Sequence, residues 1–175
     1  MGIYFKLAGA ICIMGATGYF AVSMNQTMEL RKQELRKLYS LLIQLKSEIQ
    51  YMYNPLPESF AKLAKSAKEP FSTWLFDMVN TLEEKEEITF SDVWKEGVEN
   101  LHKHSALEKE DVEPLKELAD KLGSEDVSSQ LKAIDYAVLH LEGNRTVLEK
   151  DLGQKKKVTV TLSLFCGAMT LILLL

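Results

Sequence analysis

Two histidines, His102 and His104, are the side chains whose type and spacing first suggest chemistry. Imidazole is a common metal ligand, but residues i and i+2 of a helix point to different faces. The carboxylates nearby are ordinary surface acids, so a solvated helix end is favoured over a metal site. His140 stands beside an apolar stripe and is expected to be exposed. The sequence therefore predicts no metal ion and no other cofactor.

Motifs of catalysis are missing from the sequence. It contains no glycine-rich phosphate loop, no GxSxG motif and no cysteine cluster. Cys12 and Cys166 fall in apolar segments far apart in the chain and are interpreted as packing residues. Trp74 and Trp94 stand at core spacing, which favours packing over a binding role. We therefore predict no catalytic residues and no enzyme activity.

The two ends of the 175-residue chain are far more apolar than its middle. Residues 3–24 include a single charged side chain, Lys6, and residues 158–175 include none. As helices they would extend about 33 Å and about 27 Å, which suits a hydrocarbon core of about 30 Å. Both are predicted to be transmembrane helices in contact with the lipid bilayer. For the first, a signal peptide cleaved after small residues such as Ala21 and Ser23 is the alternative.

Basic residues next to both predicted spans lie on the side of the central segment. They are Arg31, Lys32, Arg36, Lys37, Lys155, Lys156 and Lys157. The positive-inside rule therefore places residues 25–157 in the cytoplasm and both termini outside the cell membrane. Acidic and basic side chains are mixed along this segment, which argues against a nucleic-acid partner.

Apolar residues at heptad spacing predict a long helix that begins near residue 25. They are Met28, Leu35, Leu38, Leu42, Leu45, Ile49 and Met52, and Arg31 is the one polar side chain in the series. Asn54 precedes Pro55 and must leave the helical conformation, so the helix ends there. Pro57 suits the first turn of the next helix, where its missing N–H costs nothing.

Four shorter helices are expected after this turn. One ends at Pro70, and the others carry apolar stripes over residues 71–82, 93–101 and 112–122, with Thr89 and Asp92 as a capping box and Gly123 as a stop. Ser124 is expected to cap a sixth helix, whose heptad series is broken by Arg145. We therefore predict an all-α, six-helix cytoplasmic bundle between two transmembrane helices. The first and sixth helices must lie antiparallel, because they leave and re-enter the same membrane.

Glu48 lies shortly before the proline turn. Leu56 is a poor cap for a helix that starts at Pro57, so Glu48 could accept hydrogen bonds from the backbone donors of residues 57–60. The alternative is a Glu48 side chain that faces solvent.

The combination of blocks in this chain resembles the stage III sporulation protein AB family of endospore-forming bacteria. The resemblance is carried by LRKLYSLLIQLKSEIQYMYNPLPESF at 35–60, by LGSEDVSSQ at 122–130, and by Leu30, Arg31, Phe76, Trp94, Leu107 with the following KED, and Gly167. It covers nearly the whole chain. Each block alone would be unspecific.

The resemblance implies a non-enzymatic membrane platform in the mother cell, needed for the channel that links mother cell and forespore. The cytoplasmic part is similar to the helical domain of the inner-membrane platform proteins of type II secretion and type IV pilus machines. The implied partners are a cytoplasmic secretion-type sporulation ATPase and other membrane proteins of the channel. Platform proteins have two such domains and this chain has one, so a homodimer is a further hypothesis.

Polar residues at the membrane-distal end are the predicted partner contacts: Glu48, Asn54, Glu58, Asp126 and Gln130. The alternative is that some of them shape helix ends, as Asp126 would at a helix start. A different class of function is a two-span membrane sensor or transducer with a helical-bundle domain. Such proteins usually carry their bundle outside the cell and a signalling domain after the second span.

Overall fold

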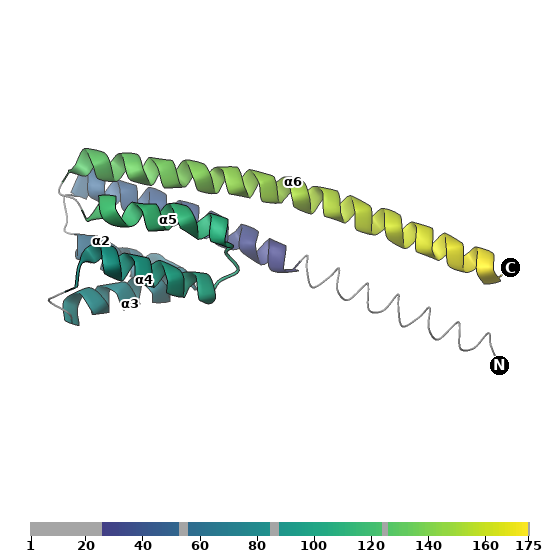
Figure 1. Ribbon diagram of the computed structural model, residues 1–175, viewed down its shortest axis with the longest axis horizontal. Coiled ribbons are helices and arrows are strands. Elements are labelled where there is room, and N and C mark those ends of the chain that lie inside the picture. The colour runs from purple at the N-terminus through teal and green to yellow at the C-terminus, as the bar shows by residue number, and fades with distance from the viewer. Residues whose placement is uncertain (1–25, 53–55, 85–87, 124–125, 175) are drawn as a thin grey trace. The chain divides into compact units, whose positions relative to one another are not determined.

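The computed structural model describes residues 26–52, 56–84, 88–123 and 126–174, and for residues 52, 155–157 and 159–174 it describes the backbone alone. A first α-helix over residues 26–47 runs directly into the π-helical turn η1. The later elements are helices (Figure 1): η1 (Glu48–Met52), α2 (Leu56–Ser66), α3 (Phe71–Glu84), α4 (Phe90–Lys103), α5 (Lys109–Leu122) and α6 (Val127–Leu174). No strand occurs among these residues, so the prediction of an all-α fold with six helices is confirmed.

The chain divides into two compact units. One comprises Arg31–Val147, and the other comprises Met1–Leu30 with Leu148–Leu175. The first unit contains the core and every polar contact discussed below.

The predicted membrane segments stay predictions. In the described part of the chain, no helix meets the length and hydropathy that a bilayer crossing requires. The span predicted over residues 3–24 lies outside the described residues. The span predicted over residues 158–175 coincides with the end of α6, which continues to Leu174, and the side chains beyond Val158 lie outside the described part.

The first helix buries the predicted stripe. Leu38, Leu42 and Leu45 are fully buried, and Leu35 and Ile49 are nearly so. The helix ends in the π-helical turn η1, whose wider hydrogen-bonding pattern is uncommon and usually confined to a single turn. Because residues 53–55 lie outside the described residues, the conformation of Asn54 and Pro55 stays a prediction. Leu56 opens α2 and Pro57 lies in its first turn, as the sequence indicates.

The first helix and α6 run antiparallel within this unit, as predicted. Lys46, late in the first helix, forms an ion pair with Asp135, early in α6, with 2.5 Å between Nζ and Oδ1. Asn144, further along α6, donates to the Asp111 carboxylate. Arg31, early in the first helix, binds the same carboxylate, so the later part of α6 lies near the earlier part of the first helix. The buried apolar residues of α6 in this unit are Ile134, Ala137 and Leu141, whereas Val127 at its start is 39% exposed.

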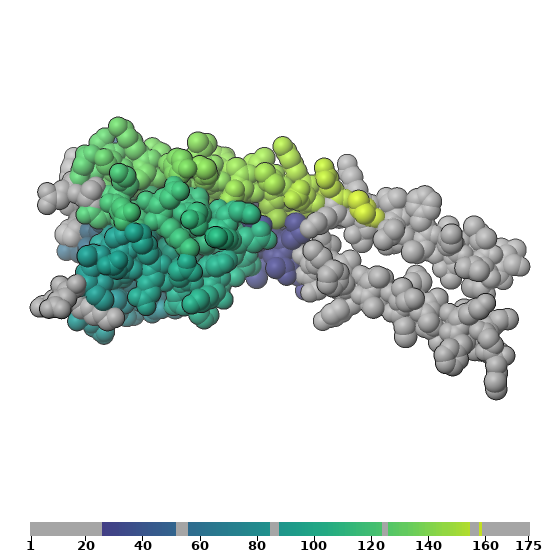
Figure 2. All heavy atoms as spheres, viewed as in Figure 1, coloured from purple at the N-terminus to yellow at the C-terminus, as the bar shows by residue number. Residues whose placement is uncertain are grey.

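Helices α2 to α5 form a second group, in which each helix packs against the next. An aromatic cluster lies at their centre: the ring of Trp94 is 5.2 Å from that of Trp74 and 5.7 Å from that of Phe60, measured between centroids. Both tryptophans are buried, which confirms their core assignment. In the space-filling view, the side chains of α4 and α5 join those of the first part of α6 in one continuous surface (Figure 2).

Helix ends in this group follow local capping. Thr89 accepts a hydrogen bond from the Asp92 N–H and caps α4, as predicted. At α6, however, the expected cap was Ser124, and the structure assigns this role to Asp126. Its carboxylate accepts from the N–H groups of Ser128 and Ser129, both at 3.1 Å. Asp126 is the better cap because it stands directly before the first helical residue.

Candidate functional site

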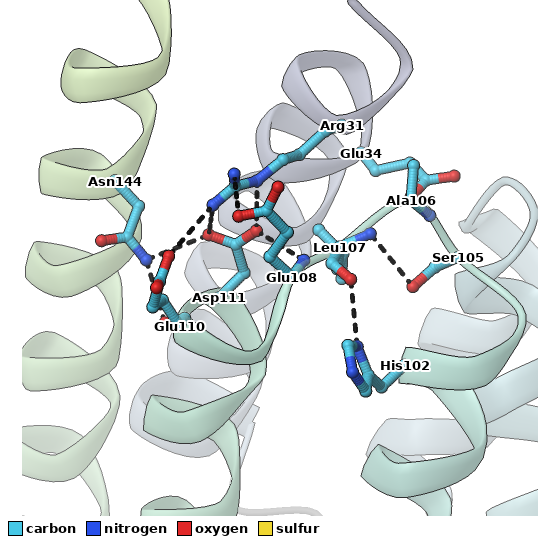
Figure 3. A network of polar contacts seen from close by, with 10 residues as sticks. All are labelled: Arg31, Glu34, His102, Ser105, Ala106, Leu107, Glu108, Glu110, Asp111 and Asn144. Atoms are coloured by element: carbon cyan, nitrogen blue, oxygen red, sulfur yellow. Dashed lines mark hydrogen bonds and ion pairs between the residues drawn. The ribbon is translucent and has the colours of Figure 1, made fainter. Parts of the chain in front are cut away.

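Arg31 and Asp111 form the centre of the most extensive polar network in the described part of the chain (Figure 3). Arg31 lies in the first helix, and Asp111 lies in the first turn of α5. The Arg31 Nε donates to Asp111 Oδ2 at 2.6 Å, and its Nη2 donates to Oδ1 at 3.0 Å. A guanidinium and a carboxylate paired in this two-point manner resist rotation, so the contact fixes both distance and orientation between the two helices.

Asp111 also organises the start of α5. Its Oδ2 accepts a hydrogen bond from the Glu108 N–H at 2.9 Å, as the third residue of a capping box does. Pro114 has no N–H, so it cannot donate to the carbonyl of Glu110 one turn earlier. Asn144 of α6 donates to that carbonyl at 2.9 Å and to Asp111 Oδ1 at 3.0 Å. The network thus satisfies a backbone acceptor that the proline leaves open.

The two buried charges of the network, on Arg31 and Asp111, compensate each other. Asp111 is completely buried, and the side chain of Arg31 is only 13% exposed. Glu108 adds a second ion pair to Arg31 at 2.5 Å. Burial works against the charge on Arg31, but the hydrogen bond and the charge of Asp111, with the charges of Glu108 and Glu110, hold its pKa above its ordinary value. Separating the pair would leave an uncompensated buried charge, so it ties the two helices to one arrangement.

Glu34 fixes the segment that precedes α5. One turn after Arg31, its Oε2 accepts from the Ala106 N–H at 2.7 Å, and the residue is 5% exposed. Burial raises the pKa of Glu34, and the hydrogen bond from Ala106 opposes this effect. In the same segment, the ring of His102 contacts the carbonyl of Leu107 at 3.0 Å. Arg31 and Glu34 of the first helix therefore hold the α4–α5 connection at Glu108 and at Ala106.

The predicted contact residues near the proline turn behave differently from one another. The Glu48 carboxylate binds Lys62 of α2 at 2.6 Å. The hypothesis that it caps α2 through residues 57–60 is therefore wrong. Lys62, six residues after the first residue of α2, offers a full charge, which is a stronger attraction than backbone donors. Glu58 is exposed on α2, and Asn54 lies outside the described residues.

The two predicted contact residues near α6 both have structural bonds. Asp126 caps α6, which corresponds to the alternative stated for it, and its hydrogen bonds with Ser129 and Ser128 lower its pKa. Gln130 is 7% exposed, and its Nε2 donates to the carbonyl of Leu122 at 2.9 Å, where α5 ends. Of the five predicted contacts, Glu58 and Asp126 are exposed in the described residues.

The histidines show no shared site in the structure. His104 is exposed, and its Nδ1 contacts the carbonyl of Asn100 at 2.9 Å. Its neighbour His102 points to the α4–α5 connection. No group of three or more metal-ligating side chains occurs among the described residues.

The Arg31–Asp111 network was not predicted from the sequence, although two signals pointed to it. Arg31 is the polar side chain inside an otherwise apolar heptad series, and a cation at such a position needs a buried partner. The KED block that begins at Lys109 supplies that partner. Helical spacing places Asp111 on the apolar face of α5, four residues before Leu115 and seven before Leu118. Nothing in the spacing shows that this face meets Arg31, because that depends on how α5 docks.

These features define a class: an all-α bundle protein whose buried charges and amides join helices and cap helix ends. A family model described as stage III sporulation protein AB matches residues 6–175, and the chain belongs to this family. The stage III sporulation protein AB of Bacillus subtilis (strain 168) is 29% identical over 170 residues, which are 97% of this chain and 99% of that protein. A solved structure of stage III sporulation protein AB aligns with a TM-score of 0.64 and 27% identity, over 71% of this chain and 97% of that one.

Proposed function

We propose that this protein is a non-enzymatic assembly platform of the sporulation channel between mother cell and forespore. The observation that carries the proposal is the match of residues 6–175 to one sporulation family. A platform needs a domain that keeps its shape while partners bind. The Arg31–Asp111 pair and the Glu34–Ala106 hydrogen bond support such a role, because they hold three separate segments in one arrangement.

The proposed partner is a cytoplasmic secretion-type ATPase of the same sporulation system, and the proposed contact is Glu58. Its side chain is exposed on α2 and forms no ion pair with any residue in the described ranges. Glu48 is a weaker candidate because Lys62 already neutralises it, and Gln130 is weaker because it is buried. An exposed carboxylate can pair with a basic side chain of a partner without breaking a contact of the bundle.

Co-purification of the full chain with that ATPase tests the proposal. We expect the wild-type chain to retain the ATPase and Glu58→Lys to lose it. Glu117→Lys reverses another exposed acid, on α5, and serves as the control that is expected to retain binding. Failure of the wild-type chain to retain the ATPase, or equal retention by Glu58→Lys, contradicts the proposed contact.

We also propose that residues 3–24 and 158–175 anchor the domain in the cell membrane, with residues 25–157 in the cytoplasm. The apolar composition of both ends and the lysines at 155–157 support this topology. A reporter that is active only outside the cytoplasm, fused after Leu175, is expected to be active. An inactive reporter there, with an active one inserted near residue 85, would reverse the proposed topology.

A homodimer of this chain is proposed as the way to supply the second domain found in the similar platform proteins. Light scattering of the full chain in mild detergent measures the mass of the protein component. We expect twice the monomer mass of 19.8 kDa. A species of monomer mass across the concentration range would contradict the homodimer, without bearing on the ATPase contact.

A further inference from the structure

A groove of about 610 Å³ runs between α3 and α4. Its floor is apolar and includes Trp74, Met78 and Leu101, whereas its rim includes the carboxylates of Asp77 and Glu96. None of these residues belongs to the Arg31–Asp111 network or to the predicted contacts. The groove is therefore a separate feature of the surface.

The indole of Trp74 is the unusual group in this groove. The residue is 4% exposed, and its Nε1 has no hydrogen-bond partner. Gly97 of α4 borders the same space: a Cβ atom added there would lie 2.8 Å from Trp74 Nε1. The Trp74 indole N–H thus lies at the wall of the groove, in the space that a side chain would take if residue 97 were not glycine.

A buried donor without a partner is uncommon, because the lost hydrogen bond to water costs about 1–3 kcal/mol of folding free energy. Trp94 shows the ordinary solution, because its Nε1 donates to the carbonyl of Leu115 at 2.5 Å. Only a small movement would expose the Trp74 donor to an acceptor in the groove. The atoms that adjoin the same position at Gly97 are Cγ and Sδ of Met78, at 3.1 Å and 3.3 Å, and methionine side chains reorient readily.

The rim supplies the charge that selects an occupant. Asp77 and Glu96 are exposed and form no ion pair with any described residue. Glu99, also at the groove, is already paired with Lys116, and Lys103 and His104 lie at its border. Asp77 and Glu96 lie on opposite helices and are free to pair. Glu69, whose side chain accepts from the Thr73 hydroxyl, is a third carboxylate at the groove without an ion pair to a described residue, and together they favour a cationic occupant.

We propose that the α3–α4 groove binds a basic, amphipathic segment of another protein. Once the Met78 side chain, now 2% exposed, reorients, a backbone carbonyl of that segment accepts the hydrogen bond of Trp74 Nε1, and its apolar side chains contact the atoms that this movement uncovers. Its lysine or arginine side chains pair with Asp77 and Glu96. The inference does not depend on the platform role or on the contact at Glu58, since it rests on the groove alone.

Nuclear magnetic resonance of the two indole N–H groups tests the proposal, because the chain has two tryptophans. The full chain, labelled with ¹⁵N in mild non-ionic detergent, is titrated with a short synthetic amphipathic peptide of leucine and lysine. Loss of one signal in Trp74→Phe assigns the two peaks. We expect the Trp74 signal to move on addition of the peptide while the Trp94 signal stays in place.

Charge variants then show whether the rim selects the peptide. The double variant Asp77→Lys with Glu96→Lys is expected to weaken association at least tenfold, and Glu117→Lys is expected to change it less than twofold. An unchanged Trp94 signal shows that each variant is folded. If the double reversal does not fold, Asp77→Asn with Glu96→Gln replaces it, with an expected weakening of at least threefold.

The same peptide with glutamate in place of lysine is expected not to move the Trp74 signal. The proposal is overturned if the lysine peptide leaves that signal unmoved, if the glutamate peptide moves it equally, or if the folded rim variants bind as the wild type does. Loss of ATPase binding in Glu58→Lys with an intact peptide response would separate this groove from the proposed platform contact.

Discussion

Asp111 and Trp74 are both buried polar side chains, yet their surroundings differ in kind. Asp111 accepts from Arg31, from the Glu108 N–H and from Asn144, so both of its oxygens have partners. Trp74 has a donor and no acceptor for it, beside a groove with an acidic rim. The hydrogen bonds of Asp111, which join helices, are complete, whereas the Trp74 donor is left open where the surface is hollowed. Among the described residues, Glu48 Oε2, Ser59 Oγ and Arg145 Nε are also buried without a partner. This difference indicates which part of the bundle holds its shape and which part has capacity to bind.

Of the two side chains compared, Asp111 is expected to affect stability most when it is removed. Asp111→Ala would leave Arg31 with its charge largely buried and would remove the acceptor of the Glu108 N–H. We expect a loss of about 3–5 kcal/mol in the free energy of unfolding, measured by denaturant titration with circular dichroism. Glu110→Ala is the control, with an expected change below about 0.5 kcal/mol, since that carboxylate is exposed and 3.8 Å from Arg31. A loss below about 1 kcal/mol in Asp111→Ala would show that the pair is not structurally important.

Replacement of either tryptophan by phenylalanine compares the two indoles directly. Trp94→Phe removes the hydrogen bond to Leu115 and leaves that carbonyl with one partner fewer. Trp74→Phe removes a similar volume but also removes an unsatisfied donor. We expect Trp94→Phe to cost about 1–2 kcal/mol more than Trp74→Phe in the free energy of unfolding. Equal costs would mean that the Trp74 donor is satisfied in solution.

Gly97 of α4, which borders the groove, can be compared with Gly143 of α6, which does not. A Cβ at Gly97 would come within 2.8 Å of the rigid indole of Trp74, whereas a Cβ at Gly143 would meet nothing within 4 Å. We expect Gly97→Ala to lower the free energy of unfolding by about 1 kcal/mol, because the clash outweighs the gain in helix propensity. Gly143→Ala should raise it by up to about 1 kcal/mol. A stabilised Gly97→Ala variant would show that Trp74 yields its position easily.

The pH dependence of Glu34 is the smallest expected effect. Burial raises its pKa in the folded protein, so the folded state keeps a proton that the unfolded chain has already lost. The free energy of unfolding therefore falls as pH rises through the interval between the unfolded-state pKa, about 4.3, and the higher folded-state pKa. Glu34→Gln lacks this fall, so its stability relative to wild type should increase over that interval.

Thermal unfolding at a series of pH values measures the difference between Glu34→Gln and wild type. The comparison with wild type removes the contribution of the other carboxylates. Glu117→Gln, in which an exposed acid is neutralised, should show no such trend. A difference that does not depend on pH would mean that Glu34 is not desolvated in the folded protein.

Local signals predicted the helices well. Thr89 with Asp92 marked the start of α4, Gly123 marked the end of α5, and the heptad series at Leu38, Leu42 and Leu45 marked the buried face of the first helix. These signals depend on residues within one or two turns, so the sequence contains them completely. The cap of α6 was placed two residues too early because Ser124 and Asp126 are both good caps and neighbouring residues do not decide between them.

Long-range partners were not predictable in the same way. Glu48 was expected either at the backbone of α2 or facing solvent, and it binds Lys62 instead. Gln130 was expected as a partner contact, and it binds the end of α5. Arg31 is separated from Asp111 by 80 residues, so no local pattern relates them. A side chain's partner depends on which helix faces it, and that is decided only when the helices pack.

Taken by itself, the order of residues determined that this chain forms helices, where most of them begin and end, and which faces are apolar, because these properties follow from backbone propensity and periodic spacing. It also determined the family, through distinct blocks that are spread over nearly the whole chain. Only the tertiary structure decided that Arg31 pairs with Asp111, and that the Trp74 donor lies unpaired beside Gly97. Those outcomes depend on distances of a few ångströms between helices that are far apart in sequence.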